Sequence, residues 1–524
     1  MATLPNLLRM GRALWVLMRE GVVTALPAEN EPPAVKRLKA VARLVERKRA
    51  TDAPQSQNLA RALNRLGPSW VKFGQFLATR PDLVGFSIAR DLQLLQDRMD
   101  PFPEDEARAM IRATLGKPVS EVFATFGAPV AAASIAQVHR ATVATPEGPR
   151  DVAVKVIRPG VREAFARDLQ VSFTAARFVD RWFPAAKRLR LVESVEMLER
   201  SVRLEMEMRL EAAAFSEMAD NTENDPDFRL PAIDWERSGR DCVTMDWVDG
   251  IKMNDVEAIR AAGHDMPGLA RKIMQAFLRH ALRDGFFHAD MHPGNLFVAA
   301  DGDIVAVDLG IAGRVTKAER RYLAEILFGF LNRDYRRVAE VHFEAGYVPL
   351  TQDPASFAQA LRAVGEPIYG RTAEQISMGN MLTLLFEITD MFEMATRPEL
   401  LLLQKTMVQV EGVARSLDPH FNMWEVAEPI LRPEVVNLIG PKARFDEARE
   451  GLAALGQLAR NAPELAQRAE MLSAEIAIMG RDGVRLDAPS IAAIGKAEAR
   501  ASRWGRVALW VIAAAAVWTA IQVS

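Results

Sequence analysis

Residues 288–295 read HADMHPGN, and residues 305–310 read VAVDLG. The first segment places Asp290 and Asn295 five positions apart, and the second ends a β-like run with Asp308. Amide and carboxylate oxygens are hard ligands that suit Mg²⁺. We therefore predict that Asn295 and Asp308 bind magnesium and that Asp290 orients a nucleophile or accepts its proton. A single aspartate of this kind would more often be a turn or cap residue, so the prediction rests on all three in this order.

The same spacing occurs in the catalytic loop of protein kinases, H-R-D-x-x-x-x-N, with His288 at the histidine position. Upstream, residues 152–155 read VAVK, and Lys155 matches the strand lysine that contacts the phosphates of ATP. The β-like runs 135–143 and 151–157 flank a Pro- and Gly-containing turn and predict a hairpin. Helices precede this small sheet and a helical region follows it, so we expect an α+β, two-lobed protein-kinase-like fold that binds ATP and Mg²⁺.

The stretch before Lys155 lacks the glycine-rich loop of ordinary kinases. It reads Ala131-Ala132-Ala133-Ser134, followed by Ile135 and Ala136. Alanine disfavours the positive φ angles that glycine allows, so this loop must pass the nucleotide in a different conformation. We assign Ala131, Ala132, Ala133 and Ser134 to nucleotide binding and expect altered nucleotide preference or restrained phosphoryl transfer.

With these features the chain resembles the UbiB/ADCK (AarF-type) family of atypical kinases, over about residues 60–420. The resemblance rests on AAASIAQVH (131–139), VAVK, HADMHPGN and the Asp-x-Gly motif at Asp308. It also rests on VKFGQ (71–75), which is similar to the KxGQ signature of that family. An alanine-rich loop together with KxGQ separates this family from ordinary protein kinases.

The resemblance implies roles for residues outside the kinase motifs. Lys72 and Gln75 would act at the catalytic site from an N-terminal helical extension that covers the docking place of a protein substrate. The ExD motif of the family maps onto Glu205-Met206-Glu207, with Glu in place of Asp. Glu211 would pair with Lys155. Because Glu207 and Glu211 are four residues apart, we expect them on one helix face, with Glu205 directed toward another partner such as Lys72.

The segment VTMDWVDG (243–250) matches the hinge of the family, so backbone groups of Asp246 and Trp247 would contact adenine. The resemblance further implies an ATPase or small-molecule kinase that supports ubiquinone (isoprenoid quinone) biosynthesis at the membrane. Its partners would be a membrane lipid or quinone precursor and other quinone-biosynthesis enzymes. Two alternatives stay open: a non-catalytic nucleotide-binding scaffold of a membrane lipid-biosynthetic complex, and a true protein kinase.

Composition and charge limit the kinds of partner, covalent cross-link and cellular location that we expect. The formal net charge of −2 argues against a nucleic-acid partner. The single cysteine, Cys242, excludes an intrachain disulfide. Residues 507–523 carry no charge and follow three arginines, which predicts a single C-terminal span. The alternative is an Ala-rich helix buried against the body. The basic flank puts the kinase-like domain on the cytoplasmic face of a bacterial inner membrane.

We divide the chain into an amphipathic N-terminal segment (1–59), a KxGQ helical extension (60–126), an N-lobe (127–248), a C-lobe (249–420), a helical tail (421–503) and a transmembrane anchor (504–524). The N-terminal segment either packs on the body or lies on a membrane surface. We expect one long helical region over 160–218 and helix breaks at prolines that include Pro429 and Pro433. The sequence does not decide the oligomeric state, and a homodimer stays open.

Overall fold

A computed structural model of the chain describes residues 4–24, 33–46, 58–78, 92, 95, 99–182, 191–366, 388–389, 391–394 and 398–440. All of these residues lie in the first of the two units into which the chain divides, residues 1–440. The proposed anchor at 504–524 and most of the tail lie outside the described residues.

The helices have the following bounds: α1 (Leu4–Arg19), α2 (Pro33–Val45), α3 (Asn58–Leu66), α4 (Pro68–Ala78), α7 (Glu104–Leu115), α8 (Val119–Val122), α9 (Val161–Trp182), α10 (Leu191–Glu205), α11 (Met208–Thr222), the 3₁₀ helix η3 (Trp235–Arg237), α12 (Val256–Ala261), α13 (Met266–Arg279), the π-helix η4 (His280–Asp284), α14 (Lys317–Leu331), α15 (Tyr335–Glu344), α16 (Pro354–Gly365), α18 (Pro398–Leu417) and α19 (Met423–Ile439). The strands are β1 (Thr125–Ala132), β2 (Ala136–Thr145), β3 (Gly148–Ile157), β4 (Phe228–Arg229), β5 (Cys242–Asp246), β6 (Ile251–Lys252), β7 (Phe286–His288), β8 (Leu296–Val298), β9 (Ile304–Ala306) and β10 (Ala312–Arg314).

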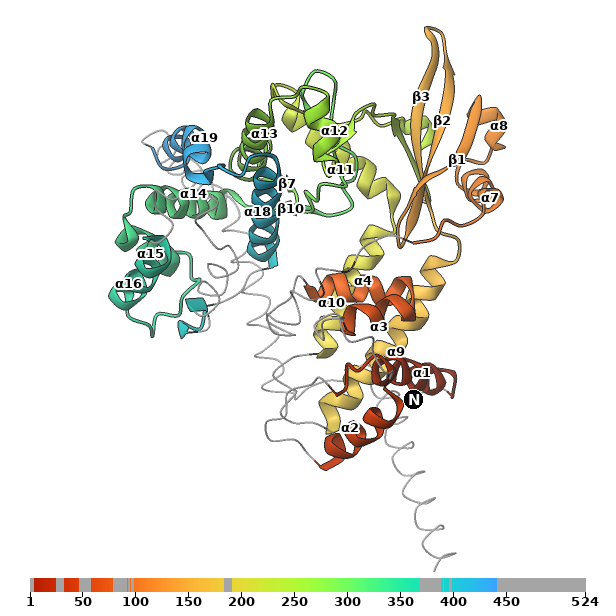
Figure 1. The fold of residues 1–524 in the computed structure, drawn as a ribbon, viewed down its shortest axis with the longest axis horizontal. Helices are drawn as coiled ribbons and strands as arrows, with labels where there is room; N and C mark the ends of the chain where they lie inside the picture. The colour runs from red at the N-terminus through yellow and green to blue at the C-terminus, as the bar shows by residue number, and fades with distance from the viewer. Residues whose placement is uncertain are drawn as a thin grey trace, which may run out of the picture. The chain divides into compact units, whose positions relative to one another are not determined.

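The N-lobe is built on an antiparallel sheet in the order β1-β2-β3-β5, with α7 and α8 beside it (Figure 1). Side chains alternate between the two faces of a strand. On β3, Val152, Val154 and Val156 therefore pack in one cluster with Ile111 of α7. Lys155 points to the opposite face, and this alternation is what directs the lysine away from the α7 side of the sheet.

The predicted hairpin is present, but it is longer than its apolar runs indicated. Strands β2 and β3 pair from Ala136 opposite Ile157 to Thr145 opposite Gly148, so only Pro146 and Glu147 stay unpaired. Gly148 has φ of 123°, which L-residues rarely adopt, and this explains a glycine there. Two of the residues that we placed in a loop, Ala131 and Ala132, belong to β1 and pair with Val138 and Gln137.

The helical region after the hairpin is not continuous, and one prediction based on it is wrong. Glu207 lies in the break between α10 and α11 with φ of −104° and ψ of 90°, outside both helices. Arg162 holds this break through the Met206 carbonyl at 2.6 Å, and the Met208 N–H donates to the Arg240 carbonyl at 3.1 Å. Because Glu207 precedes the first helical residue, it does not share a helix face with Glu211.

The C-lobe combines two small sheets with a helical body. Strands β4-β9-β8-β6 form one sheet and β7 pairs with β10 in the other. Helix α13 packs against α18 and α19, and its buried side chains join the main core. Helix α14 begins at a capping box between Thr316 and Glu319, the S/T-x-x-E pattern.

The expected helix breaks at two prolines were wrong. Helix α19 continues through Pro429 and Pro433, whereas Pro354 and Pro398 stand at the first positions of their helices. Helix α19 packs against α13 and α14, and Leu431 between the two prolines is fully buried. Apolar packing therefore offsets the lost backbone hydrogen bonds.

The N-terminal helices pack on the body. Helix α1 contacts α2, α3 and α9, with Ala13 and Met18 buried. In helix α4, a Cβ added at Gly74 would lie 2.3 Å from Leu95 Cδ1 and 2.5 Å from Leu63 Cδ1, so the glycine of the KxGQ motif lets these two leucines pack closely on the helix. Among the described helices, none combines the length and apolarity that crossing a bilayer requires.

Candidate active site

Lys155 lies between two carboxylates that come from different parts of the chain. Its Nζ is 2.6 Å from Glu211 Oε1 on α11 and 2.9 Å from Asp308 Oδ2 after β9. The Glu211 side chain is 5% exposed and that of Asp308 is 39% exposed. The more accessible of the two carboxylates, Asp308, is the one predicted to bind magnesium.

Lys155 and Asp308 hold each other in the ionised state, whereas burial, the largest influence, raises the pKa of Glu211. Burial by itself disfavours the charged forms, and it is the largest influence on the pKa of Lys155 and on that of Asp308. The carboxylates of Asp308 and Glu211 nevertheless raise the pKa of Lys155. Lys155 in turn lowers the pKa of Asp308 to about 2 against the effect of burial. An ammonium and a carboxylate are therefore both present near neutral pH, as a phosphate and metal site requires.

The catalytic-loop segment is closed by its own hydrogen bonds. The Asn295 side-chain amide donates to the Asp290 backbone carbonyl at 3.2 Å, and the Asn295 N–H donates to the His292 carbonyl at 2.8 Å. The Val307 N–H donates to the Asn295 carbonyl at 3.0 Å, which ties this loop to the strand that leads to Asp308. Since its Nδ2 is engaged, Asn295 keeps Oδ1 as the side-chain atom that can bind a metal.

Two residues that the sequence did not single out contact Asp290. Lys405 Nζ and Gln409 Nε2 of α18 each lie 3.1 Å from Asp290 Oδ1. They follow Asp290 by 115 and 119 positions, and no motif links them to it. Their spacing of four residues on one helix is the only signal, and it becomes meaningful only once Asp290 is placed beside that helix.

The alanine-rich segment forms a tight turn without positive φ angles. The Ala133 N–H donates to the Ala136 carbonyl at 2.8 Å, and Ser134 is fully buried. The Arg158 guanidinium donates to the Ala133 carbonyl at 3.1 Å and to the Asp100 carbonyl at 3.0 Å. None of residues 131–134 appears among the positive-φ positions of the described chain. The turn is therefore braced from the side of the N-terminal extension.

The last residues of the alanine-rich motif are structural. Gln137 is buried and bonds both backbone groups of Phe102, accepting from its N–H at 2.9 Å and donating to its carbonyl at 3.2 Å. His139 lies 2.8 Å from the Gly127 carbonyl through Nδ1 and 2.9 Å from Gln137 through Nε2. Burial, the largest influence, lowers the pKa of His139, which keeps the ring neutral.

The hinge segment is fixed by backbone and side-chain contacts. The Asp246 N–H donates to the Ala232 carbonyl at 3.0 Å, and the Trp247 N–H donates to the Asp151 carbonyl at 3.1 Å. Both of these amide donors are engaged within the protein, so the carbonyls of Asp246 and Trp247 are the groups left to test for adenine contact.

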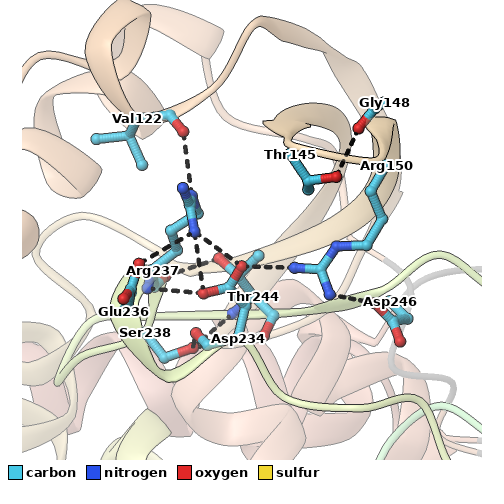
Figure 2. A network of polar contacts seen from close by, with 10 residues as sticks. All are labelled: Val122, Thr145, Gly148, Arg150, Asp234, Glu236, Arg237, Ser238, Thr244 and Asp246. Carbon is cyan, nitrogen blue, oxygen red and sulfur yellow. Dashed lines mark hydrogen bonds and ion pairs between the residues drawn. The ribbon is translucent and has the colours of Figure 1, made fainter.

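Figure 2 shows the polar network behind the hinge. The Asp234 carboxylate accepts from Arg150 at 2.7 Å and from Arg237 at 3.1 Å, and Arg150 also pairs with Asp246 at 3.1 Å. Arg237 additionally donates to the Val122 carbonyl at the end of α8 at 3.2 Å. The side chain of Asp246 is therefore part of the brace that joins β3, β5 and α8.

The helical extension contacts the C-terminal end of α10. Lys72 of α4 pairs with Glu205, the last residue of α10, and Lys72 is buried. Gln75 lies one turn further along α4 and is half-buried. Glu207 pairs instead with Arg209 at 2.6 Å, which lowers the pKa of that carboxyl. The two glutamates of the ExD-like motif thus have different partners.

The donor set fits Mg²⁺. Magnesium is usually held by one or two carboxylates together with phosphates and water, and here Asp308 and Asn295 are tied to each other through the β8–β9 hairpin. In the described ranges, no three carboxylate, imidazole or thiol side chains gather in the manner of a self-sufficient metal site.

Comparison with known proteins defines the class. Residues 94–342 match the ABC1 atypical kinase-like domain, and residues 361–422 match the UbiB helical domain. The predicted kinase-like α+β fold with additional helical parts is thereby confirmed.

Curated relatives then give the particular family. A probable protein kinase UbiB of Marinobacter nauticus is 38% identical over 88% of this chain and 84% of its own length. One of Aeromonas salmonicida is 37% identical over 87% of this chain and 84% of its own. The chain belongs to the UbiB family of atypical kinases, as its motifs indicated.

A solved structure, the complex of Rv3197 with erythromycin from Mycobacterium tuberculosis, is similar to this chain with a TM-score of 0.49 and 23% identity. The similarity covers 71% of this chain and 94% of that one.

Proposed function

We propose that this protein binds Mg-ATP between its two lobes and uses ATP hydrolysis or phosphoryl transfer to support ubiquinone biosynthesis at the membrane. The observation that carries the proposal is the convergence of Lys155 with Glu211 and Asp308. A lysine held between two carboxylates from both lobes is the arrangement that active kinases need for the nucleotide phosphates and the metal. Membership of the UbiB family supports the same reading.

Each residue of the proposed ATP site has a separate role. Lys155 would bind the phosphates of ATP, and Asn295 and Asp308 would bind magnesium, which neutralises phosphate charge when present. Asp290 would orient the attacking hydroxyl of water or of a small acceptor. The attacking oxygen forms a bond to the γ-phosphorus, the bond to the bridging oxygen breaks, and ADP leaves with the electron pair. The proton of the hydroxyl passes to Asp290.

The acceptor is inferred from the N-terminal extension. Helix α4, with Lys72 and Gln75, would cover the docking place of a protein substrate, and the braced alanine turn would restrict the nucleotide pose. Water or a lipid-derived acceptor therefore fits better than a polypeptide. The relatives are named probable protein kinases, so protein phosphorylation remains the alternative that an acceptor assay should test.

The membrane role rests on the sequence. The uncharged stretch near the C-terminus and its basic flank support a single span with the kinase-like domain on the cytoplasmic face of the inner membrane. A membrane lipid or quinone precursor and other quinone-biosynthesis enzymes would then be the partners. Retention of small molecules by the purified protein, measured by mass spectrometry, would identify the lipid.

The proposal is tested by comparing wild type with Asp308→Asn in Mg-dependent nucleotide binding and in ATPase assays with lipid vesicles. We expect Asp308→Asn to lower turnover by about 100-fold or more, since it removes a magnesium ligand. Asp301→Asn is the matched control, because Asp301 lies in the turn of the β8–β9 hairpin and pairs with Arg229 on the surface. If wild type and Asp308→Asn were equally silent with lipid present, the non-catalytic scaffold would replace the enzyme.

The pathway is tested separately by the quinone profile of a deletion strain. Loss of ubiquinone that wild type restores and Asp308→Asn does not restore is the expected result. Normal ubiquinone in the deletion strain would remove the pathway assignment and leave nucleotide binding untouched.

A further inference from the structure

Helix α18 brings a cation and an amide to the catalytic aspartate. Lys405 and Gln409 are one helical turn apart and therefore lie on the same face. Both donate to a single atom, Asp290 Oδ1, at 3.1 Å. Lys405 also forms an ion pair with this carboxylate, with the lysine side chain 22% exposed. Lys405 and Gln409 lie within residues 361–422, the match to the UbiB helical domain, whereas Asp290 lies in the match to the kinase-like domain.

The two donors leave the oxygens of Asp290 in different states. Each carboxylate oxygen accepts through two lone pairs, so Lys405 and Gln409 together saturate Oδ1. The Asn295 amide lies 3.5 Å from Oδ2, a contact too long to compete with an incoming hydroxyl. The carboxylate is therefore fixed in rotation, with one oxygen held by α18 and the other available.

The ion pair is partly withdrawn from water. The Lys405 side chain is 22% exposed and the Asp290 side chain is 32% exposed. Because solvent screens such a pair less than a fully exposed one, Lys405 fixes the carboxylate more firmly than a surface lysine would.

We propose that Lys405 and Gln409 are positioning residues for Asp290, which hold Oδ1 so that Oδ2 receives the proton of the attacking hydroxyl. The helical segment around α18 is then part of the catalytic apparatus. This inference rests on the proposed ATP chemistry.

The test is the effect of Lys405→Met on the turnover number and on the KM for ATP. Without the lysine, Gln409 is the donor of α18 that still holds Oδ1, so the carboxylate is less well oriented toward the attacking hydroxyl. We expect a turnover number at least about tenfold lower, with the KM for ATP nearly unchanged. Lys405→Arg should recover most of the turnover, and Gln409→Leu should lose less than Lys405→Met.

Arg415→Met is the matched control. Arg415 lies on the same helix, its side chain is also 22% exposed, and it pairs with the buried Glu411 rather than with Asp290. We expect it to lower thermal stability without lowering the turnover number. An unchanged or higher turnover number in Lys405→Met would overturn the positioning role while the proposed function stands. A wild-type protein without Mg-dependent ATP binding would overturn both.

Discussion

Two buried lysine–glutamate pairs in this protein have the same chemistry and different surroundings. Lys155 and Lys72 are both 11% exposed, and each meets a glutamate. Lys155 stands on a strand of the N-lobe sheet and is shared with Asp308, a carboxylate 39% exposed. Lys72 stands on helix α4 and joins it to the end of α10. The two lysines therefore differ in one respect: Lys155 has a second, accessible carboxylate from the other lobe, which its proposed role in nucleotide binding uses.

The largest expected effect comes from removing the shared cation. Lys155→Met leaves Glu211 and Asp308 close together without a positive charge, so we expect about 3–5 kcal/mol less unfolding free energy and a loss of ATP turnover. Chemical denaturation and ATPase assays measure the two effects. Arg140→Met is the control, since it breaks the exposed Arg140–Asp151 pair across the adjacent strands and should change stability little. Equal stability losses in the two variants would break the comparison.

The Lys72–Glu205 ion pair should stabilise the packing of helix α4 against helix α10. We expect Lys72→Met or Glu205→Met alone to cost about 3 kcal/mol, because each leaves a poorly solvated charge unpaired. The double variant should lose at least about 1 kcal/mol less than the sum of the single variants. Equilibrium denaturation of all four proteins provides the coupling energy. Strictly additive losses would show that the pair does not hold α4 against α10.

Gly74, the glycine of the KxGQ motif, tests a role in packing rather than in chemistry. In Gly74→Ala the new methyl group meets Leu63 and Leu95, so we expect a loss of about 1–3 kcal/mol in stability from overpacking. Gly412→Ala on α18 is the opposite control, because nothing lies within 4 Å of its added Cβ. It should gain about 0.5–1 kcal/mol from helix propensity. Thermal melts distinguish the two, and a stabilised Gly74→Ala would contradict the close contact of α4.

Cys242 tests burial without an opposite charge. The expected effect concerns the reactivity of the thiol and not stability or turnover, so it comes last. Its strand neighbour Val243 is paired with Lys155, yet the thiol faces the α7 side of the sheet. Burial, aided by the nearby Asp241, raises the pKa of the thiol to about 12. We expect alkylation near pH 8 to be about a thousandfold slower in the folded protein than in denaturant. Rapid labelling of the folded protein would show that this face opens to solvent.

Local sequence patterns predicted much of the fold. The run DVAVKVI predicted a strand. In the structure this strand buries its three valines on one face and presents Lys155 on the other, because strand periodicity is a property of the backbone. The family signatures, which lie within short segments, likewise identified the UbiB family and its kinase-like fold. The proline rule failed in α19 because it describes one residue, whereas the helix is held by packing along its whole length.

The sequence by itself singled out the side chains that we propose for phosphate and metal chemistry, namely Lys155, Asp290, Asn295 and Asp308. Only the tertiary structure decided what surrounds them. It separated Glu207 from Glu211 at a helix break, and it brought Lys405 and Gln409 of α18 to Asp290. The physical reason is that motifs record local backbone geometry, while an ion pair across 115 residues depends on how separate elements pack, which no short stretch of sequence encodes.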